Sequence, residues 1–183
     1  TEDRLEDMFE YSSMPDLYKY MEYEPHQSIK ETRVYFNEVL RRMSSGRFNG
    51  LSHYWFVQEK KSDKTIGTLS FEGINFDEKT ADIVGFASSP AYWKHKYIFE
   101  YLHIGLNYAF ESLKLDVINA TTMVDNKPVR SLLELAGAIS GETLKEHYMI
   151  QKTQERKDAV RYSLLRENFT NSRLLGFSRA FLS

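Results

Sequence analysis

Three strand-like segments follow one another in the middle of the chain, and they constrain the fold more than any other feature. Residues 53–60 carry aromatic and β-branched side chains, residues 65–75 read TIGTLSFEGIN, and residues 81–87 read ADIVGFA. Short polar turns at 61–64 and 75–79 separate the three segments. Strands with such short connections pair most simply as an antiparallel meander. The middle of the chain therefore predicts a β-sheet.

Helical spacing on both sides of these strands completes the pattern. A helix around Leu5 and a second one that begins with a capping box, Ser28 followed by Glu31, precede the strands. The elements expected after the strands are a helix through 102–113, a strand at 116–123, a helix from Pro128 to Gly137, and strands at 142–150 and 158–165. Strand–helix–strand spacing indicates that the strand at 116–123 pairs parallel near the preceding one. This order predicts an α/β fold with a mixed sheet, in one domain of residues 1–167 with a C-terminal extension at 168–183.

Composition excludes several kinds of site and partner. The chain of 183 residues has no cysteine, which excludes disulfides, iron–sulfur clusters and a cysteine nucleophile. Its 24 basic and 26 acidic residues give a net charge of −2, so we expect no nucleic-acid partner. The five histidines lack the i, i+4 spacing of a helical metal site, and we expect no metal. Because there is neither an apolar run of roughly 18 residues nor a signal-peptide pattern, we expect a cytoplasmic protein without a membrane partner.

Several short strings, taken in order, resemble the GNAT acetyltransferase superfamily, and most closely its RimJ/RimL-like branch. They are PHQSIKET at 25–32, IGTLSF at 66–71, IVGFASSPAYW at 83–93, the pair Asp125-Asn126, LLELAG at 132–137 and DAVRYSLLRENF at 158–169. The resemblance covers nearly the whole chain. It implies a central, mostly antiparallel sheet with a V-shaped split, flanked by helices. The first strand of the family has no counterpart in this sequence, and we expect it to precede Thr1.

The resemblance also implies a binding site for acetyl-CoA as co-substrate. In GNAT proteins its pantetheine runs along the third of these strands, and its pyrophosphate binds amides at the start of the next helix, where unpaired donors and the helix dipole favour an anion. The implied cofactor-binding residues are Phe86, Ala87, Ser88, Trp93, Lys94, His95, Lys96, Tyr97, Ile98 and Asn126. The family usually has glycine where this chain has Lys94 and Lys96. Either these lysines and His95 bind the pyrophosphate by charge, or their bulk blocks the cofactor.

Amine acetylation needs a group that accepts a proton from the amine, and a donor for the departing thiolate helps. Asn126 matches an asparagine of the family after the fifth strand, and it could equally be a helix cap. Leu133 stands at the position where the family has a tyrosine proton donor. Tyr148 stands at the position of a glutamate that acts as the base in the RimL-like branch, and the Tyr148 hydroxyl could donate a proton to the thiolate. The candidate catalytic residues are Asn126, Tyr148 and Glu72, with Asp82 and His53 as further candidate bases. For each base, the alternative is a polar residue that faces solvent.

The segment before the strands forms one wall of the acceptor site in relatives, and here it is rich in tyrosine and glutamate. Such side chains suit a cationic amine, or they pack the first helices together. The expected substrate-binding residues are Tyr23, Glu24 and Trp55. We therefore expect an N-acetyltransferase that acts by direct attack in a ternary complex on an amino sugar (free or nucleotide-linked), a polyamine or a protein N-terminus; a homodimer is a possible assembly. The alternatives are a GNAT-fold binding or partner module without transferase activity, and a sensor that binds acetyl-CoA.

Overall fold

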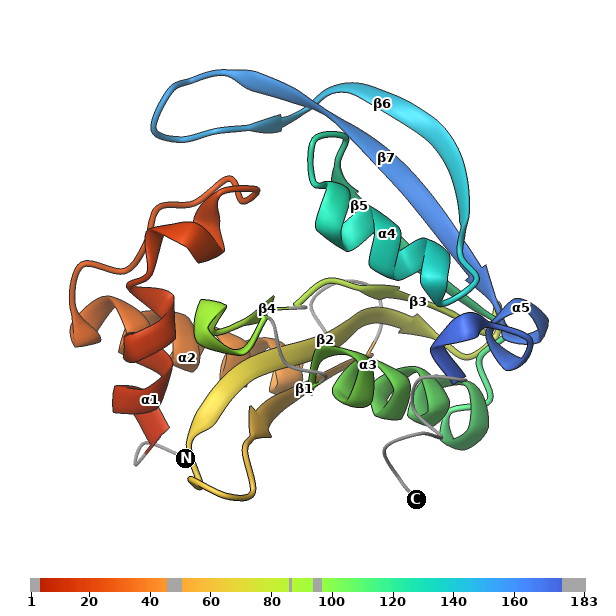
Figure 1. Cartoon of the computed structure of the whole chain (residues 1–183), viewed down its shortest axis with the longest axis horizontal. Coiled ribbons are helices and arrows are strands. Elements are labelled where there is room, and N and C mark those ends of the chain that lie inside the picture. Colours follow the sequence, from red (N-terminus) through yellow and green to blue (C-terminus); the bar gives the residue numbers. More distant parts are fainter. Residues whose placement is uncertain (1–3, 46–50, 86, 94–96, 176–183) are drawn as a thin grey trace.

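Within the residues that the structure describes, one mixed β-sheet of seven strands lies at the centre of the fold (Figure 1). The computed structural model describes residues 4–45, 51–85, 87–93 and 97–175. The strands are β1 (Leu51–Gln58), β2 (Thr65–Asn75), β3 (Thr80–Ile83), β4 (Ala87–Ser88), β5 (Val117–Met123), β6 (Ile139–Met149) and β7 (Arg156–Leu165). The helices are α1 (Leu5–Ser12), α2 (Ile29–Ser45), α3 (Tyr97–Asn107), α4 (Lys127–Leu135) and α5 (Arg166–Thr170), with short helical turns η2 (Pro15–Tyr18), η3 (Pro90–Tyr92) and η4 (Tyr108–Ser112). The strand order β1-β2-β3-β5-β7-β6, with β4 on β2, confirms the predicted α/β fold.

The first three strands form the expected antiparallel meander, in which β2 pairs with both β1 and β3. The single strand expected at 81–87 is wrong, because β3 ends at Ile83 and β4 is a separate strand on β2. The division follows from two hydrogen bonds to β2. The amides of Val84 and Gly85 donate to the backbone oxygen and the side-chain hydroxyl of Ser70, at 3.1 and 2.7 Å, so the chain bulges here instead of continuing its ladder.

A parallel pair, β3 with β5, marks the point where the sheet divides. The pairing runs from Thr80 opposite Val117 to Asp82 opposite Asn119 and ends there. Beyond this point β4 stays on β2, whereas β5 continues along β7 as far as Met123. The sheet therefore opens into the V-shaped split that the resemblance implied, and the vertex of the split lies at Asp82 and Asn119.

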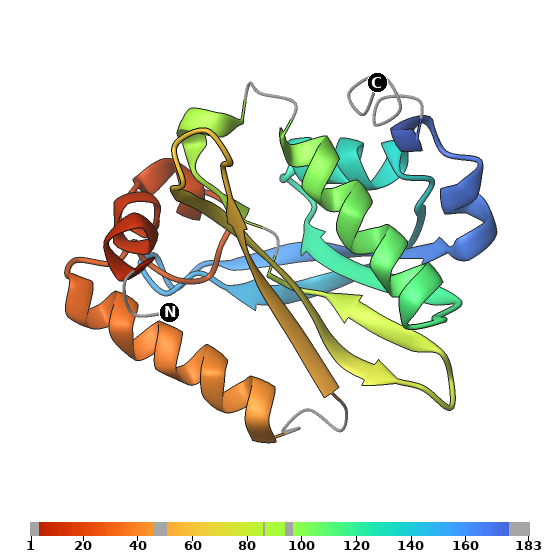
Figure 2. The same ribbon diagram turned by 90° about the horizontal axis from the view of Figure 1, so that it is seen from below.

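The two faces of the sheet carry different helices, and Figure 2 shows β1 and β2 running between α2 and α3. One face, here called the α3 face, holds the main core together with α3, α4 and α5. This core includes Leu69, Phe71, Leu102, Leu106, Ile118, Leu132, Tyr162, Leu164 and Phe169. On the opposite side, the α2 face, a smaller cluster of Leu5, Met8, Tyr11 and Phe36 packs under α1 and α2. Because side chains alternate along a strand, each residue of β1–β7 can be assigned to one face from the register.

The start of α2 follows its predicted capping box. The amide of Glu31 donates to the Ser28 hydroxyl at 3.4 Å, and the Glu31 carboxylate accepts from the amide of Gln27 at 2.9 Å. These contacts satisfy amides that the first turn of a helix leaves without partners. They also join the end of the segment between η2 and α2 to the first turn of the helix.

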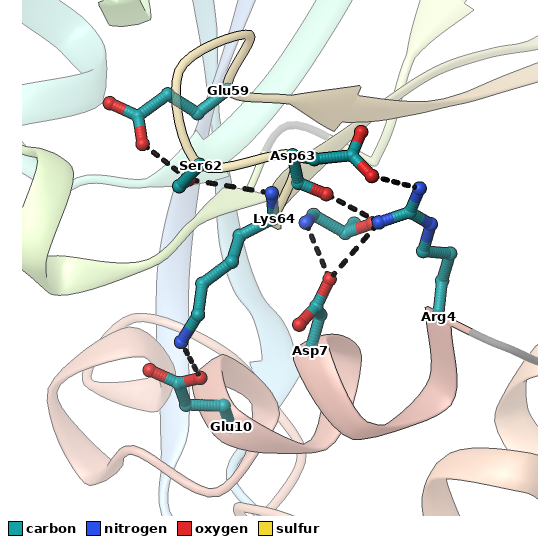
Figure 3. Close-up of polar contacts among 8 residues, drawn as sticks. Arg4, Asp7, Glu10, Glu59, Ser62, Asp63 and Lys64 are labelled. Atoms are coloured by element: carbon teal, nitrogen blue, oxygen red, sulfur yellow. Dashed lines mark hydrogen bonds and ion pairs between the residues drawn. The ribbon is translucent and has the colours of Figure 1, made fainter.

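Polar contacts fasten α1 to the turn between β1 and β2 (Figure 3). The Arg4 guanidinium pairs with the Asp63 carboxylate at 2.7 Å. The Asp7 carboxylate accepts the amide of Thr65, the buried first residue of β2, at 2.8 Å. The helix that covers one end of the α2 face is therefore held by hydrogen bonds as well as by its apolar side.

The chain after β7 returns to the α3 face. Phe169 in α5 and Leu174 are buried in the main core. Residues 168–175, the described part of the expected C-terminal extension, therefore pack against the domain. The last two strands, β6 and β7, begin at Ile139 and Arg156, slightly before their expected starts.

Candidate active site

The split leaves part of the sheet's backbone facing away from β2. The amide of Ser89 donates to the oxygen of Ile66 at 2.7 Å, so this amide points toward β2. The carbonyl of Ser88 belongs to the same trans peptide group as this amide, so it points in the opposite direction, away from β2 and toward the split. Its oxygen accepts a hydrogen bond from the indole Nε1 of Trp93 at 2.9 Å. A ligand with amide groups could pair with this backbone as an added strand does.

Apart from Asn126, the expected cofactor-binding residues that are described lie in β4, in the segment after it, or in the first turn of α3. Ser88 is buried, and Trp93 is 45% exposed beside it. Tyr97 is the first residue of α3, and its hydroxyl donates to Glu59 at 2.9 Å. Ile98 packs against the main core. The expected residues Phe86, Lys94, His95 and Lys96 lie outside the described residues.

A row of polar side chains crosses the α2 face at the vertex of the split. In the register, Glu72 of β2 is opposite Asp82 of β3, Asp82 is opposite Asn119 of β5, and Asn119 is opposite Ser163 of β7. The Ser163 hydroxyl donates to Asn119 Oδ1 at 2.9 Å. Directly opposite residues in a sheet have Cβ atoms roughly 4.5–5.5 Å apart. The side chains of Glu72 and Asp82 therefore start from directly opposite positions of the sheet at the vertex.

Glu72 is a buried carboxylate with fixed partners. Its side chain accepts a hydrogen bond from the Tyr54 hydroxyl, and only 8% of the residue is exposed. Burial, followed by the hydrogen bond to Glu72, raises the pKa of Tyr54, so the phenol stays protonated as the donor. Arg42 of α2 lies close to both side chains. Burial opposes the charge of Arg42, but its hydrogen bond with Glu38 and the proximity of Tyr54 and Glu72 raise its pKa.

Asp82 has different surroundings from Glu72, although the two are adjacent. Within the described parts of the chain, no hydrogen bond or ion pair is made to its carboxylate. Burial raises the pKa of Asp82, and the positive charge of Arg161 opposes this shift. Burial therefore suits the Asp82 carboxyl to take up a proton, whereas the Glu72 carboxylate is already engaged by the Tyr54 hydroxyl.

Asn126 caps α4 at the end of the turn after β5. Its Oδ1 accepts the amide of Val129 at 3.4 Å, and its Nδ2 donates to the Thr122 hydroxyl at 3.0 Å. The structural alternative for this residue, a helix cap, is confirmed, and its contact with a cofactor stays a prediction. Leu133, at the family's tyrosine position, is buried in the main core and brings no donor to the split.

Tyr148 reaches the α2 face from the outer hairpin of β6 and β7. Its hydroxyl donates to the backbone oxygen of Thr121 on β5 at 3.1 Å. Burial, followed by the negative charge of Glu22, raises the pKa of Tyr148. Glu22 itself contacts the hairpin, since its Oε1 accepts the amide of Met149 at 3.2 Å and its backbone oxygen accepts the amide of Gln151 at 3.0 Å. The segment between η2 and α2 therefore lies against the hairpin next to Tyr148.

The expected acceptor-binding residues are on opposite faces of the sheet. Tyr23, which is 61% exposed, and Glu24 belong to the segment between η2 and α2, which lies beside the hairpin tip in Figure 1. Trp55 and the candidate base His53 lie instead on the α3 face, where both rings contact Tyr108 at centroid distances of 5.1 and 5.9 Å. The structure thus brings Tyr23 and Glu24 to the side of Glu72 and Tyr148 and separates Trp55 and His53 from them.

Two further properties of the described part of the chain concern metal sites and membrane-spanning helices. Among the described residues, no three histidine, aspartate or glutamate side chains come together in a way that could hold a metal ion. Of the helices in those same ranges, none combines the length and the hydropathy needed to span a bilayer.

Comparison with known proteins assigns the family. The family model described as an acetyltransferase (GNAT) domain matches residues 1–139. The chain belongs to the GNAT acetyltransferase family. A curated relative of this GNAT chain, the uncharacterized N-acetyltransferase p20 of Bacillus licheniformis, is 25% identical over 161 residues, which are 87% of this chain and 86% of the relative.

Solved structures share the fold of this GNAT chain. A GCN5-related N-acetyltransferase from Brucella melitensis superimposes with a TM-score of 0.80 at 17% identity, over 100% of this chain and 79% of that one. A spermidine N-acetyltransferase from Vibrio cholerae, in complex with CoA and spermine, gives a TM-score of 0.74 at 19% identity, over 93% and 95% of the two chains. At these identities the likeness establishes the fold alone.

The residues that sequence reasoning missed in this GNAT chain are Arg42 and Tyr54, together with the contact of Glu22 with the hairpin. The signal for Tyr54 was the alternation along its strand, because it is the neighbour of Trp55 and must face the other way. Arg42 and Glu22 gave no such signal, since their partners on β2 and β6 are remote in the sequence.

Proposed function

We propose that the chain is an acetyl-CoA-dependent N-acetyltransferase that acetylates the primary amine of a small acceptor by direct attack in a ternary complex. One observation carries the proposal: the split between β4 and β5 has two acidic residues, Glu72 and Asp82, at directly opposite positions of its vertex, and the Tyr148 hydroxyl on the same face. Amine acetylation uses these two kinds of group, a proton acceptor near the amine and a donor near the thiolate.

The edge of the split suits acetyl-CoA. The Ser88 peptide faces the split with an oxygen that can accept from an amide, as it accepts from the Trp93 indole. α3 presents its N-terminus, starting at Tyr97, to an anionic group. When bound, acetyl-CoA supplies the acetyl group as a thioester. The residues proposed to hold it are Phe86, Ala87, Ser88, Trp93, Lys94, His95, Lys96, Tyr97, Ile98 and Asn126.

The residues on this face have different roles in the reaction of the amine. Amines attack only in the neutral form, whereas they arrive as ammonium ions near neutral pH. Glu72, held in place by Tyr54, attracts the ammonium. Asp82 accepts the proton, because burial brings its pKa closer to that of the amine. Tyr148, whose pKa is raised, stays protonated and can donate to the departing thiolate.

The proposed acceptor is a small amine, with a polyamine as the first class to test. Exposed aromatic and acidic side chains, Tyr23 and Glu24, line the segment beside the hairpin and suit a cation. The spermidine N-acetyltransferase from Vibrio cholerae that shares this fold was crystallised with spermine. Amino sugars, nucleotide-linked amino sugars and protein N-termini are the other classes that belong in the same screen.

The direct test is release of free CoA thiol from acetyl-CoA, followed with a thiol-reactive dye in the presence of spermidine, glucosamine or an N-terminal peptide. The chain has no cysteine, so the protein itself gives no background. We expect acceptor-dependent thiol release that falls by a factor on the order of 10²–10⁴ in Asp82→Asn. Release that is the same with and without every amine, or unchanged in Asp82→Asn, would contradict the proposal.

A second candidate, a GNAT-fold binding module without transferase activity, is favoured by one observation. The position of the family's tyrosine donor is Leu133, which is buried among apolar side chains. Absence of both acetyl-CoA binding and acceptor-dependent thiol release would support this second candidate, whereas binding of acetyl-CoA without thiol release would support the sensor.

A further inference from the structure

The hairpin that carries Tyr148 is not fixed by strand pairing alone. β6 is an edge strand, and most of its residues are exposed. Its register on β7 shifts between Leu144 and Tyr148, where Glu146 has a φ of 51°. A bulge of this kind bends the strand and interrupts its ladder. The direction of the Tyr148 side chain therefore depends on contacts outside the hairpin.

Glu22 provides such a contact from the opposite end of the sequence. Its carboxylate accepts the amide of Met149, the residue after Tyr148, at 3.2 Å. Its backbone oxygen accepts the amide of Gln151 at 3.0 Å. Figure 1 shows the segment between η2 and α2 next to the tip of the hairpin. One residue thus joins the wall that contains Tyr23 and Glu24 to the strand that contains Tyr148.

We propose that Glu22 is a positioning residue, which holds the hairpin tip so that the Tyr148 hydroxyl stays over β5 on the α2 face. The inference rests on the proposed function, in which Tyr148 is the proton donor. The charge of Glu22 adds to burial in keeping the phenol protonated. Titratable side chains of the hairpin that lie next to Tyr148 include His147, whose ring contacts Tyr148 at 4.8 Å, and Lys157, its partner on β7; Arg156 and Asp158 flank Lys157.

The experiment compares Glu22→Ala and Glu22→Gln with a matched control, Glu155→Gln. Glu155 lies at the same hairpin tip and pairs with Lys157 at 2.9 Å, so the control removes one charge there without touching the contact with Met149. Two readouts do not need activity: hydrogen exchange of the Met149 amide, and the phenol pKa of Tyr148 from the NMR signal of ring-labelled tyrosine. The third readout is kcat and KM in the thiol-release assay, with Tyr148→Phe and the double variant E22A/Y148F alongside.

We expect the Met149 amide to exchange on the order of tenfold faster in Glu22→Ala, with a smaller change in Glu22→Gln, which keeps an acceptor oxygen. The phenol pKa falls in both variants and is unchanged in Glu155→Gln. The kcat of Glu22→Ala falls toward that of Tyr148→Phe while the KM for acetyl-CoA is unchanged, and the double variant is no slower than Tyr148→Phe alone.

Unchanged amide exchange and an unchanged phenol pKa in Glu22→Ala would overturn the inference. A double variant slowed by the product of the two single effects would do the same, because independent residues act additively. A wild-type chain that releases no thiol with any amine would contradict the proposed function instead, and the exchange and titration results would still decide whether Glu22 positions Tyr148.

Discussion

At the scale of single residues, Asn126 has one observed role, as a helix cap, and one proposed role, as a contact of the cofactor, and experiments can separate the two. Its side-chain amide both caps α4 and donates to the buried Thr122 hydroxyl. We expect Asn126→Ala to lower the free energy of unfolding by about 1 kcal/mol, the usual loss for a helix cap. In a domain of this size that is a fall of about 2–4 °C in Tm. We also expect kcat/KM to fall by a factor on the order of ten or more, since the proposed contact with the cofactor would be lost as well.

The matched control is Asn126→Asp, which keeps the oxygen that accepts the Val129 amide. Thermal melts and thiol release on both variants separate the two roles. If the loss of turnover in Asn126→Ala matches the loss of folded protein at the assay temperature, Asn126 is a cap and nothing more.

Asp82 gives a prediction about pH. Its folded pKa lies above the ordinary value of 3.8 because of burial. The folded state therefore favours the protonated carboxyl. Below its ordinary pKa, Asp82 is protonated in both the folded and the unfolded chain and does not change the free energy of unfolding. As the pH rises through the folded-state pKa, ionisation of the buried carboxyl lowers that free energy. Asp82→Asn should consequently raise Tm relative to wild type at pH 7, and the difference should vanish at pH 3. A variant that is less stable than wild type at pH 7 would contradict this account of its surroundings.

At the scale of elements, the position of β4 depends on Gly67. A Cβ at this position would lie 2.4 Å from the backbone oxygen of Ala87, so a side chain cannot fit without moving β4. We expect Gly67→Ala to lower the free energy of unfolding by about 1–3 kcal/mol, as overpacking does. Affinity for acetyl-CoA should fall as well, because the Ser88 edge moves. Gly141→Ala is the control, since its nearest contact would be an ordinary 3.4 Å, and calorimetric titration measures both affinities.

The docking of α1 gives a second prediction at this scale. Asp7 accepts the amide of the buried Thr65, whereas Lys64 and Glu10 form an exposed pair at 2.7 Å. Removing the acceptor of a buried amide costs about 1–3 kcal/mol, whereas an exposed ion pair contributes about 0–1 kcal/mol. Denaturant unfolding should therefore show a larger loss of stability for Asp7→Ala than for Lys64→Ala. Equal losses would mean that the hydrogen bond in Figure 3 does not hold α1 in place.

The elements that could be predicted from the sequence are those that their own residues determine. β2 matches its expected bounds, because alternating side chains and polar turns define both of its ends. The division of the strand at 81–87 could not be predicted, because it depends on hydrogen bonds from Val84 and Gly85 to Ser70 on another strand. The same holds for the hairpin tip, whose position involves Glu22.

At the scale of the whole molecule, the candidate site combines segments that are remote in the sequence. Glu22 and Met149 are 127 residues apart, and no local pattern relates them. Glu72, Asp82 and Tyr148 were each found from the sequence, but their common face became visible only through the strand register. Trp55 shows the opposite case: it was expected beside the acceptor, and the register turns it to the α3 face.

The domain limits and the assembly belong to the same scale. The expected boundary after residue 167 and a homodimer both stay predictions, although Phe169 and Leu174 already pack in the main core. The alternation of faces explains why one sheet can hold a packed core on one side and polar, titratable groups on the other.

The most direct test of the central claim is a thermal melt of the folded chain with and without saturating acetyl-CoA, with free CoA as a comparison. A ligand that binds only the folded state, at about 100 times its dissociation constant, stabilises by about 2.7 kcal/mol. For a domain of this size we predict a rise in Tm of about 5–11 °C. An unchanged Tm in a folded chain would contradict the claim that the split between β4 and β5 is a working acetyl-CoA site.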